Sequence, residues 1–323
     1  MFNHRLRLHG RFKVFVQAVL ILGLCGPLAI AAASLSGIGH RWVDILAQFP
    51  APVLTLTVLA TLVIGLARLW TATAVGAAVL TLLLLAVWPQ YAPGGPAVAP
   101  DSPVVRLYAA NLYAMNDDVA AMRASIEAAD ADIIVLVEFG EAPNAAVETL
   151  LAGYPHREIT ERVVRSEDAV RSVIASRYPL SRRSTEGNER QMISAVADTP
   201  IGPVRVVGVH LTRPWPFQFQ WGQIIQSQNL LDHTDGAPEP VVLAGDFNSV
   251  ASARIGRLLR SQGDLVHAPG WPGTWPAALP GPLRMTIDQV YHSRDIAVAR
   301  RRLGAPTGSD HRPVIVELSR PAA

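Results

Sequence analysis

The stretch Leu243-Ala244-Gly245-Asp246-Phe247-Asn248-Ser249 organises the interpretation of the whole chain. The apolar run before it, Pro240-Val241-Val242-Leu243, predicts a short buried strand that stops at Gly245. Because side chains alternate along an extended segment, Asp246 and Asn248 fall on one side and Phe247 on the other. A carboxylate suits a hard divalent cation, and a carboxamide can donate to a phosphate oxygen. The pair therefore predicts phosphate chemistry at a strand end.

An isolated Gly-Asp-x-Asn sequence fits a polar turn equally well, but similar residues accompany other apolar runs. Four more runs end in or carry a residue that handles metals or phosphates, and another run begins just after such a residue. In chain order these residues are Asn111, Glu138, His210, Asp288 and the triplet Ser309-Asp310-His311. Any one of them is more often structural, since buried polar side chains are usually just hydrogen-bonded. Together, and nearly all at strand ends, they predict one composite site.

Composition divides the chain into two unlike regions. Half of the 323 residues are apolar, and the excess lies before about residue 90. Six of the 28 basic and one of the 26 acidic residues precede residue 101, which leaves 22 basic and 25 acidic residues from residue 101 onward. That balance argues against a basic nucleic-acid-binding domain. The single cysteine, Cys25, excludes an intrachain disulfide and a thiolate metal cluster.

Three apolar segments, residues 14–35, about 52–66 and about 71–88, predict three transmembrane helices. A cleaved signal peptide is the alternative for the first segment, and buried core helices are the alternative for the other two. The basic residues before residue 14 favour a cytoplasmic N-terminus. Three crossings of the cytoplasmic (inner) membrane then place the rest of the chain on its outer, periplasmic side, and an even number would reverse this.

The expected organisation is a membrane region over residues 1–88, a Pro/Gly-rich linker over 89–103 and a catalytic domain over 104–323. In the last region short apolar runs alternate with helix-like segments, expected over residues 117–129, 142–151, 218–231 and 251–259. Residues 181–190 are expected to form a polar loop. Many short strands with a few helices are typical of an α/β fold in which two packed sheets have helices outside.

The ordered set of Asn111, Glu138, His210, Asp246-x-Asn248, Asp288 and Ser309-Asp310-His311 resembles the endonuclease/exonuclease/phosphatase (DNase I-like) superfamily. The resemblance covers about residues 103–319, and its most specific parts are the Gly-Asp-x-Asn and Gly-Ser-Asp-His sequences. It implies a four-layer α/β sandwich and a metal-dependent phosphoesterase.

The resemblance also implies a metal set, in which Glu138 is the principal ligand of Mg²⁺ (with Mn²⁺ as the alternative). Asn111 lies nearby and Asp310 contributes. Such a cation offsets charge on the phosphoryl oxygens of the substrate.

The implied catalytic set is Asp246, Asn248, His210, Asp288 and His311. Asp246 would orient or activate the attacking water, and Asn248 would hold a phosphate oxygen. His210 would stabilise the phosphate or the leaving group, and Asp288 would pair with His311. Which histidine acts as acid and which as base stays open.

Two further residues are candidates for substrate binding. Arg177 matches a family segment, although a salt bridge at a strand end explains an arginine there slightly better. Trp215 lies in the rigid loop 211–217, and a second loop, 271–276, is also rich in proline and tryptophan. These loops either pack on the domain itself or contact bases or the membrane interface.

The expected substrate is a phosphodiester, either nucleic acid or a phospholipid or small molecule near the membrane. No protein partner is evident from the sequence. Two rival functions are a binding protein that kept the fold without catalysis and a transport role for the apolar helices.

Overall fold

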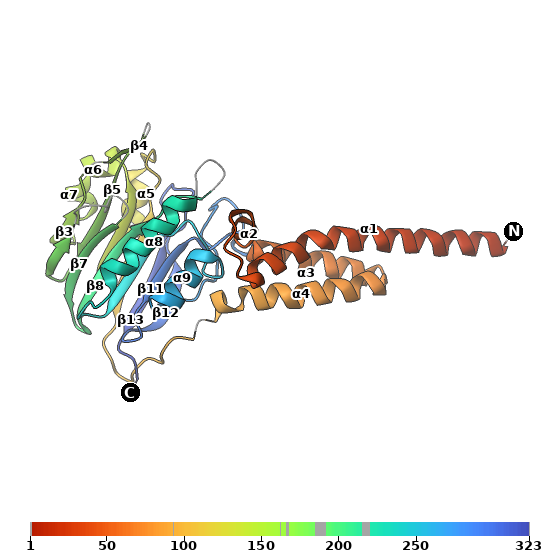
Figure 1. Cartoon of the computed structure of the whole chain (residues 1–323). Coiled ribbons are helices and arrows are strands. Elements are labelled where there is room, and N and C mark those ends of the chain that lie inside the picture. Colours follow the sequence, from red (N-terminus) through yellow and green to blue (C-terminus); the bar gives the residue numbers. More distant parts are fainter. Residues whose placement is uncertain are drawn as a thin grey trace. The chain divides into compact units, whose positions relative to one another are not determined.

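The computed structural model describes residues 2–92, 94–161, 163–165, 168–184, 192–214 and 220–322. The chain forms two compact units, Met1–Pro89 and Gln90–Ala323. Each unit has its own core and is described separately (Figure 1).

The first unit is entirely helical in its described part. Its helices are α1 (Phe2–Ser36), α2 (Arg41–Leu46), α3 (Pro50–Leu66) and α4 (Trp70–Tyr91), the last of which runs two residues into the second unit. Two segments are long and apolar enough to cross a membrane, Arg11–Ser36 and Trp70–Tyr91. The 17 residues of α3 span about 26 Å, which is less than the roughly 30 Å of a bilayer core. The structure thus has two full-length candidate spans and one shorter apolar helix where the sequence predicted three spans.

One polar side chain inside the apolar part of α1 has a structural task. The Gln17 Oε1 atom accepts hydrogen bonds from the backbone N–H groups of Thr71 at 3.1 Å and Ala72 at 3.4 Å. These N–H groups belong to the first turn of α4, where no helical partner exists. Gln17 therefore caps α4 from a neighbouring helix.

The second unit contains two β-sheets, built in its described part from strands β1 to β13. The first sheet has seven strands in the order β12-β13-β1-β2-β5-β3, with β4 paired to β5, and the second has six in the order β10-β11-β9-β8-β7-β6. The bounds are β1 Val105–Asn111, β2 Ile133–Phe139, β3 His156–Ile159, β4 Val163–Arg165, β5 Asp168–Ser176, β6 Leu180–Ser184, β7 Met192–Thr199, β8 Gly202–His210, β9 Val241–Asp246, β10 Val266–His267, β11 Asp288–His292, β12 Ala297–Leu303 and β13 Val314–Ser319. Strands β1 and β2 are parallel, as are β8 and β9, and a hydrogen bond from Asn111 to Asp246 shows that β1 and β9 end at the same end of the sandwich.

Three apolar layers hold the sheets and helices together. Side chains such as Leu107, Val135 and Val206 fill the space between the sheets. Met122 and Ile126 of α5 (Val119–Ala129) pack on the outer face of the first sheet. Helices α8 (Gln220–Thr234) and α9 (Arg254–Gln262) cover the second sheet (Figure 1). The predicted four-layer α/β sandwich is confirmed.

Several local predictions were wrong. Strand β6 occupies residues 180–184, where a loop was expected to begin, and strands β3 and β4 were not predicted. The segment 142–151 forms two short helices, α6 (Glu141–Ala145) and α7 (Val147–Leu150). The sequence of β6, Leu-Ser-Arg-Arg-Ser, lacks apolar alternation because β6 is an edge strand with one neighbour, and an edge strand can carry charged side chains.

The expected linker is partly packed on the second unit. The Gln90 side chain is 1 % exposed, and its Nε2 atom donates to Thr286 Oγ1 at 3.3 Å. The Gln90 carbonyl accepts a hydrogen bond from the Gly270 N–H at 2.8 Å. Further on, Ala99 N–H donates to the Arg320 carbonyl at 2.9 Å. The compact unit therefore begins at Gln90, before the expected boundary at residue 104.

Candidate active site

Strand alternation gathers four polar residues at one end of the space between the sheets. Asn111 continues the inward-facing series of Leu107 and Ala109, and His210 continues that of Val204 and Val206. Asp246 and Asp288 follow the same rule in β9 and β11. The sheet register places Asp246 directly between His210 and Asp288. Three strands of the second sheet and β1 of the first thus present one cluster.

Glu138 reaches this cluster by a different route. Alternation would turn it outward with Ile134 and Leu136, whose side chains pack under the helices. The pairing of β2 with β5 shifts between Leu136 and Phe139, and Glu138 has φ +49°. Such a bulge re-aims one side chain, and a left-handed φ on a non-glycine residue costs free energy that the surrounding structure must supply. Glu138 therefore faces Asn111 and His210 instead of the helices.

Gly245 lets β9 carry Asp246 into the cluster, and we expect Gly245→Ala to destabilise the second unit. Gly245 has φ +139°, and an added Cβ would lie 2.1 Å from the Val209 carbonyl oxygen. Positive φ and a backbone clash together should cost at least about 2 kcal/mol, which lowers Tm by about 4–8 °C for a unit of this size. Gly153→Ala is the matched control, because its Cβ would meet nothing within 4 Å. Circular dichroism melting in detergent checks both, and equal Tm values for the two variants would contradict the argument.

The Asn111 amide joins two carboxylates. Its Nδ2 atom donates to Glu138 Oε1 at 2.9 Å and to Asp246 Oδ2 at 3.0 Å, while its Oδ1 atom accepts from the Tyr113 N–H at 2.9 Å. The structure therefore gives Asn111 the place of a donor that holds both acids, with its oxygen turned away from them. His210 completes this part, with Nε2 at 3.2 Å from Glu138 Oε1.

Asp246 and Asn248 lie close together, as predicted, but a turn brings them together and not continued strand alternation, because β9 ends at Asp246. Asp246 Oδ1 accepts from the Asn248 N–H at 2.8 Å, and Asn248 Nδ2 lies 3.2 Å from Asp246 Oδ2. Asn248 also donates to the Leu211 carbonyl at 2.9 Å and has φ +47°. The loop after β9 is thus closed around the Asp246 carboxylate.

His311 and Asp288 form a buried pair beside Asp246. The Nδ1–H of His311 donates to Asp288 Oδ2 at 2.9 Å, and its Nε2 atom lies 3.9 Å from Asp246 Oδ2. Burial opposes charge on the imidazole, but the charge and hydrogen bond of Asp288 outweigh it and raise the pKa of His311 to about 10. This pKa favours the imidazolium form at neutral pH, and Nε2 lies 3.9 Å from both Asp246 Oδ2 and Asp310 Oδ1.

The pKa values of Glu138 and Asp246 shift in opposite directions. Burial disfavours ionised Glu138, yet the hydrogen bond and charge of His210, with Asn111 and His311, hold the pKa of Glu138 well below its usual range. Burial is the main cause that raises the pKa of Asp246 to about 6, and the nearby Asp288 adds to it against the opposing charge of His311. A carboxylate with a pKa near neutrality is suited to accept a proton.

Among the described residues, two groups have side-chain ligand atoms within 4.8 Å of one another, Glu138–His210–Asp246 and Asp246–Asp288–His311. Each group offers two carboxylates and a histidine, so each is a possible site for a divalent cation, although in the second Asp288 already binds His311 Nδ1. The donor chemistry of Glu138 and Asp246 suits a hard cation. The identity of the ion does not follow from the geometry.

Three predicted residues remain to be placed: Asp310, Trp215 and Arg177. Asp310 lies at the edge of the cluster, with its side chain 54 % exposed and Oδ1 at 3.9 Å from His311 Nε2. Trp215 falls outside the described residues.

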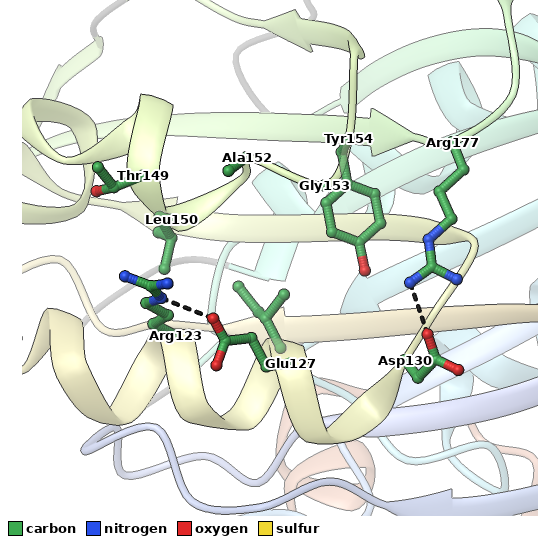
Figure 2. A pocket seen from close by; sticks show the side chains of 10 residues that line it. Arg123, Glu127, Asp130, Thr149, Leu150, Ala152, Gly153, Tyr154 and Arg177 are labelled. Atoms are coloured by element: carbon green, nitrogen blue, oxygen red, sulfur yellow. Dashed lines mark hydrogen bonds and ion pairs between the residues drawn. The ribbon is translucent and has the colours of Figure 1, made fainter.

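Arg177 is not brought to the cluster. It lies beside Asp132 at the start of β2, roughly 20 Å along the strand from Glu138. There its Nη2 atom donates to Asp130 Oδ1 at 2.6 Å, and its guanidinium lies over the Tyr154 ring (Figure 2). The pocket that these residues line also includes α5 residues Arg123 and Glu127, which pair with each other. The salt bridge at a strand end accounts for Arg177.

Sequence reasoning missed the specific task of the loop between β10 and β11. Thr274 Oγ1 accepts from the Asp288 N–H at 3.2 Å, and Trp275 Nε1 donates to Asp310 Oδ2 at 2.9 Å. The loop had been noted only for its prolines and tryptophans. The sequence feature that could have indicated this task is the position of the loop directly before the strand that carries Asp288.

These strands, their inward carboxylates and the paired histidine define a phosphoesterase-type site on a four-layer sandwich. Residues 108–311 match the Endonuclease/Exonuclease/phosphatase family, and the chain belongs to this family. It is a hydrolase of that family with a buried Asp/His cluster. The comparison with curated proteins found no match.

Solved structures share the fold. An endonuclease/exonuclease/phosphatase from Beutenbergia cavernae DSM 12333 is 22 % identical, with a TM-score of 0.52 over 68 % of this chain and 72 % of that one. The human Nocturnin catalytic domain with bound sulfate is 17 % identical, with a TM-score of 0.52 over 68 % and 94 % of the two chains. A humanized D. rerio TDP2 is 12 % identical, with a TM-score of 0.54 over 67 % and 98 %. At these identities the likeness concerns the fold.

Proposed function

We propose that the second unit, called the catalytic unit from here on, hydrolyses phosphodiester bonds with a divalent cation, Mg²⁺ or Mn²⁺. The observation that carries the proposal is the joining of Glu138 and Asp246 through the Asn111 amide, opposite the His311–Asp288 pair. Phosphoester hydrolysis needs a cation that offsets the negative charge on the phosphoryl oxygens, a positioned water and a proton donor. This cluster can supply all three.

Each residue has a place in the reaction. Glu138, with Asp246 and His210 beside it, would hold the cation, which when bound offsets the negative charge of the phosphate. Asp246 accepts the proton of the attacking water. The N–H of the His311 imidazolium, oriented by Asp288, donates toward a phosphoryl or leaving oxygen.

The proposal predicts metal-dependent cleavage of a simple diester. The full-length chain in detergent should hydrolyse bis(p-nitrophenyl) phosphate with Mg²⁺, faster than the monoester p-nitrophenyl phosphate, and EDTA should abolish the activity. Glu138→Gln should raise the Mg²⁺ concentration for half-maximal rate at least about tenfold. Glu127→Gln, an exposed acid paired with Arg123, is the control and should change nothing. Hydrolysis that resists EDTA, or a preference for the monoester, would sink the proposal.

The same preparation distinguishes the two substrate classes. Supercoiled plasmid tests a nuclease, and vesicles containing a phospholipid test a lipid phosphodiesterase. The excess of acidic over basic residues after residue 101 gives no support to tight binding of a polyanion. The long apolar helices favour a substrate at the membrane. Nicking by wild type that is lost with EDTA would decide for nucleic acid.

We further propose that the first unit anchors the chain in the cytoplasmic membrane by three crossings, with α3 as the shortest, and leaves the catalytic unit on the outer side. The apolar length of α1 and α4, and the Gln17 side chain that caps the first N–H groups of α4, support an anchor. Protease added to intact spheroplasts should then digest the catalytic unit. Protection in spheroplasts combined with digestion in inverted vesicles would reverse the orientation.

A further inference from the structure

The loop between β10 and β11 is fixed on both sides before it reaches the cluster. The backbone of Trp275 exchanges hydrogen bonds with Met285, N–H to carbonyl at 3.0 Å and carbonyl from N–H at 2.7 Å. From β12, Arg301 Nη1 donates to the Pro272 carbonyl at 2.6 Å. Trp275 is therefore held by the protein backbone independently of any ligand.

The same loop holds Asp310 at two points. The indole Nε1–H of Trp275 donates to Asp310 Oδ2 at 2.9 Å, and the Ala277 N–H donates to the Asp310 carbonyl at 2.7 Å. The Asp310 side chain is 54 % exposed, so few other contacts fix its rotamer. With Oδ2 bound to the indole, Oδ1 is the oxygen that faces His311 Nε2, at 3.9 Å.

A neutral donor suits this task. The indole N–H orients the carboxylate and leaves its negative charge in place. A lysine or arginine would instead neutralise that charge. The Trp275 ring also lies beside the His311 ring, with centroids 6.4 Å apart. The indole thus fixes the direction of the Asp310 carboxylate and adds no opposing charge.

We propose that Trp275 is a positioning residue, whose indole N–H holds the Asp310 carboxylate in the orientation that faces His311 Nε2, the atom that also lies 3.9 Å from Asp246 Oδ2. The proposal rests on the proposed function, because it assigns Asp310 a task in the metal-loaded site. Trp275 acts through Asp310 and does not touch the reacting atoms.

The test compares Trp275→Phe, which keeps an aromatic ring and removes the donor, with Asp310→Ala and the double variant in the full-length chain. Trp275→Phe should lower kcat for the diester about tenfold, with KM within about twofold, as loss of a hydrogen bond to a charged group predicts. In the Asp310→Ala background the same substitution should change kcat less than about twofold. Trp271→Phe, in the exposed tryptophan of the same loop, should leave kcat unchanged. A full tenfold loss that persists without Asp310 would overturn the proposal.

Mn²⁺ affinity, measured by electron paramagnetic resonance without substrate, gives a readout that does not need turnover. Trp275→Phe should weaken Mn²⁺ binding several-fold, and Trp271→Phe should not. Hydrolysis by wild type together with unchanged kcat and unchanged Mn²⁺ affinity in Trp275→Phe would overturn this inference and leave the proposed function standing. If Trp275→Phe weakens Mn²⁺ binding but the wild type does not hydrolyse the diester, only the proposed function is overturned. A wild type that neither binds Mn²⁺ nor hydrolyses the diester would overturn both.

Discussion

Asp246→Asn should reduce kcat for the diester at least about 10³-fold, because the carboxylate has two tasks that a carboxamide cannot perform. It is the proposed acceptor for the proton of water, and it belongs to the group that fits a cation. The substitution also places an NH₂ group where Oδ2 now accepts from Asn111 at 3.0 Å. Two donors would then face each other in a buried site, which costs free energy.

The pH profile separates the proton-accepting task from a general loss of structure. Asp246 must be ionised both to accept a proton and to hold the cation, so wild-type kcat/KM should fall on the acid side of the profile, and burial, which raises the pKa of Asp246 to about 6 before a cation binds, moves that limb toward neutrality. The residual activity of Asp246→Asn should lack this acid limb. Asp295→Asn, at an exposed site, is the control and should keep the limb and the rate. Retention of a tenth or more of the wild-type rate in Asp246→Asn would exclude Asp246 as the acceptor.

Strand periodicity was enough to predict which residues come together from β1, β8, β9 and β11. Asn111, His210, Asp246 and Asp288 each continue an inward-facing apolar series, and such a series is visible in the sequence. Asn111, His210 and Asp246 lie at the carboxyl ends of strands in two parallel pairs, and Asp288 joins them as the first residue of β11, which is antiparallel to β9. This part of the site required only alternation and topology.

Periodicity could not predict the residues that break it. Glu138 enters the cluster through a bulge and a left-handed backbone, and both depend on how β2 meets β5. Arg177 ends its strand as the others do, but at the opposite end, because β5 runs antiparallel to β2. A strand end in the sequence does not state which end of the sheet it occupies. The donor role of Trp275 depends likewise on a loop contact with a residue 35 positions away.

The second large effect concerns the pairing of Asp288 with His311. Asp288→Asn should lower kcat about 10²–10³-fold, because the neutral amide removes the charge that keeps His311 protonated and oriented. The pKa of His311 is raised to about 10 in the wild type. The ion pair therefore contributes fully to stability below the ordinary histidine pKa of about 6.5 and loses its contribution as the pH rises through about 10.

A double-variant cycle tests whether Asp288 and His311 act together or independently. If Asp288 acts only through His311, then well above pH 6.5, where an unpaired imidazole is neutral, Asp288→Asn, His311→Gln and the double variant should have kcat values within about threefold of one another. Asp288→Asn alone should also lose activity above about pH 6.5, where its unpaired imidazole becomes neutral, whereas the wild type should keep its activity well beyond that pH. Losses that multiply in the double variant would mean that Asp288 contributes separately, through its position next to Asp246 in the sheet. In that case the carboxylate would stabilise the cluster as a whole, and the alkaline limb of Asp288→Asn would coincide with that of the wild type.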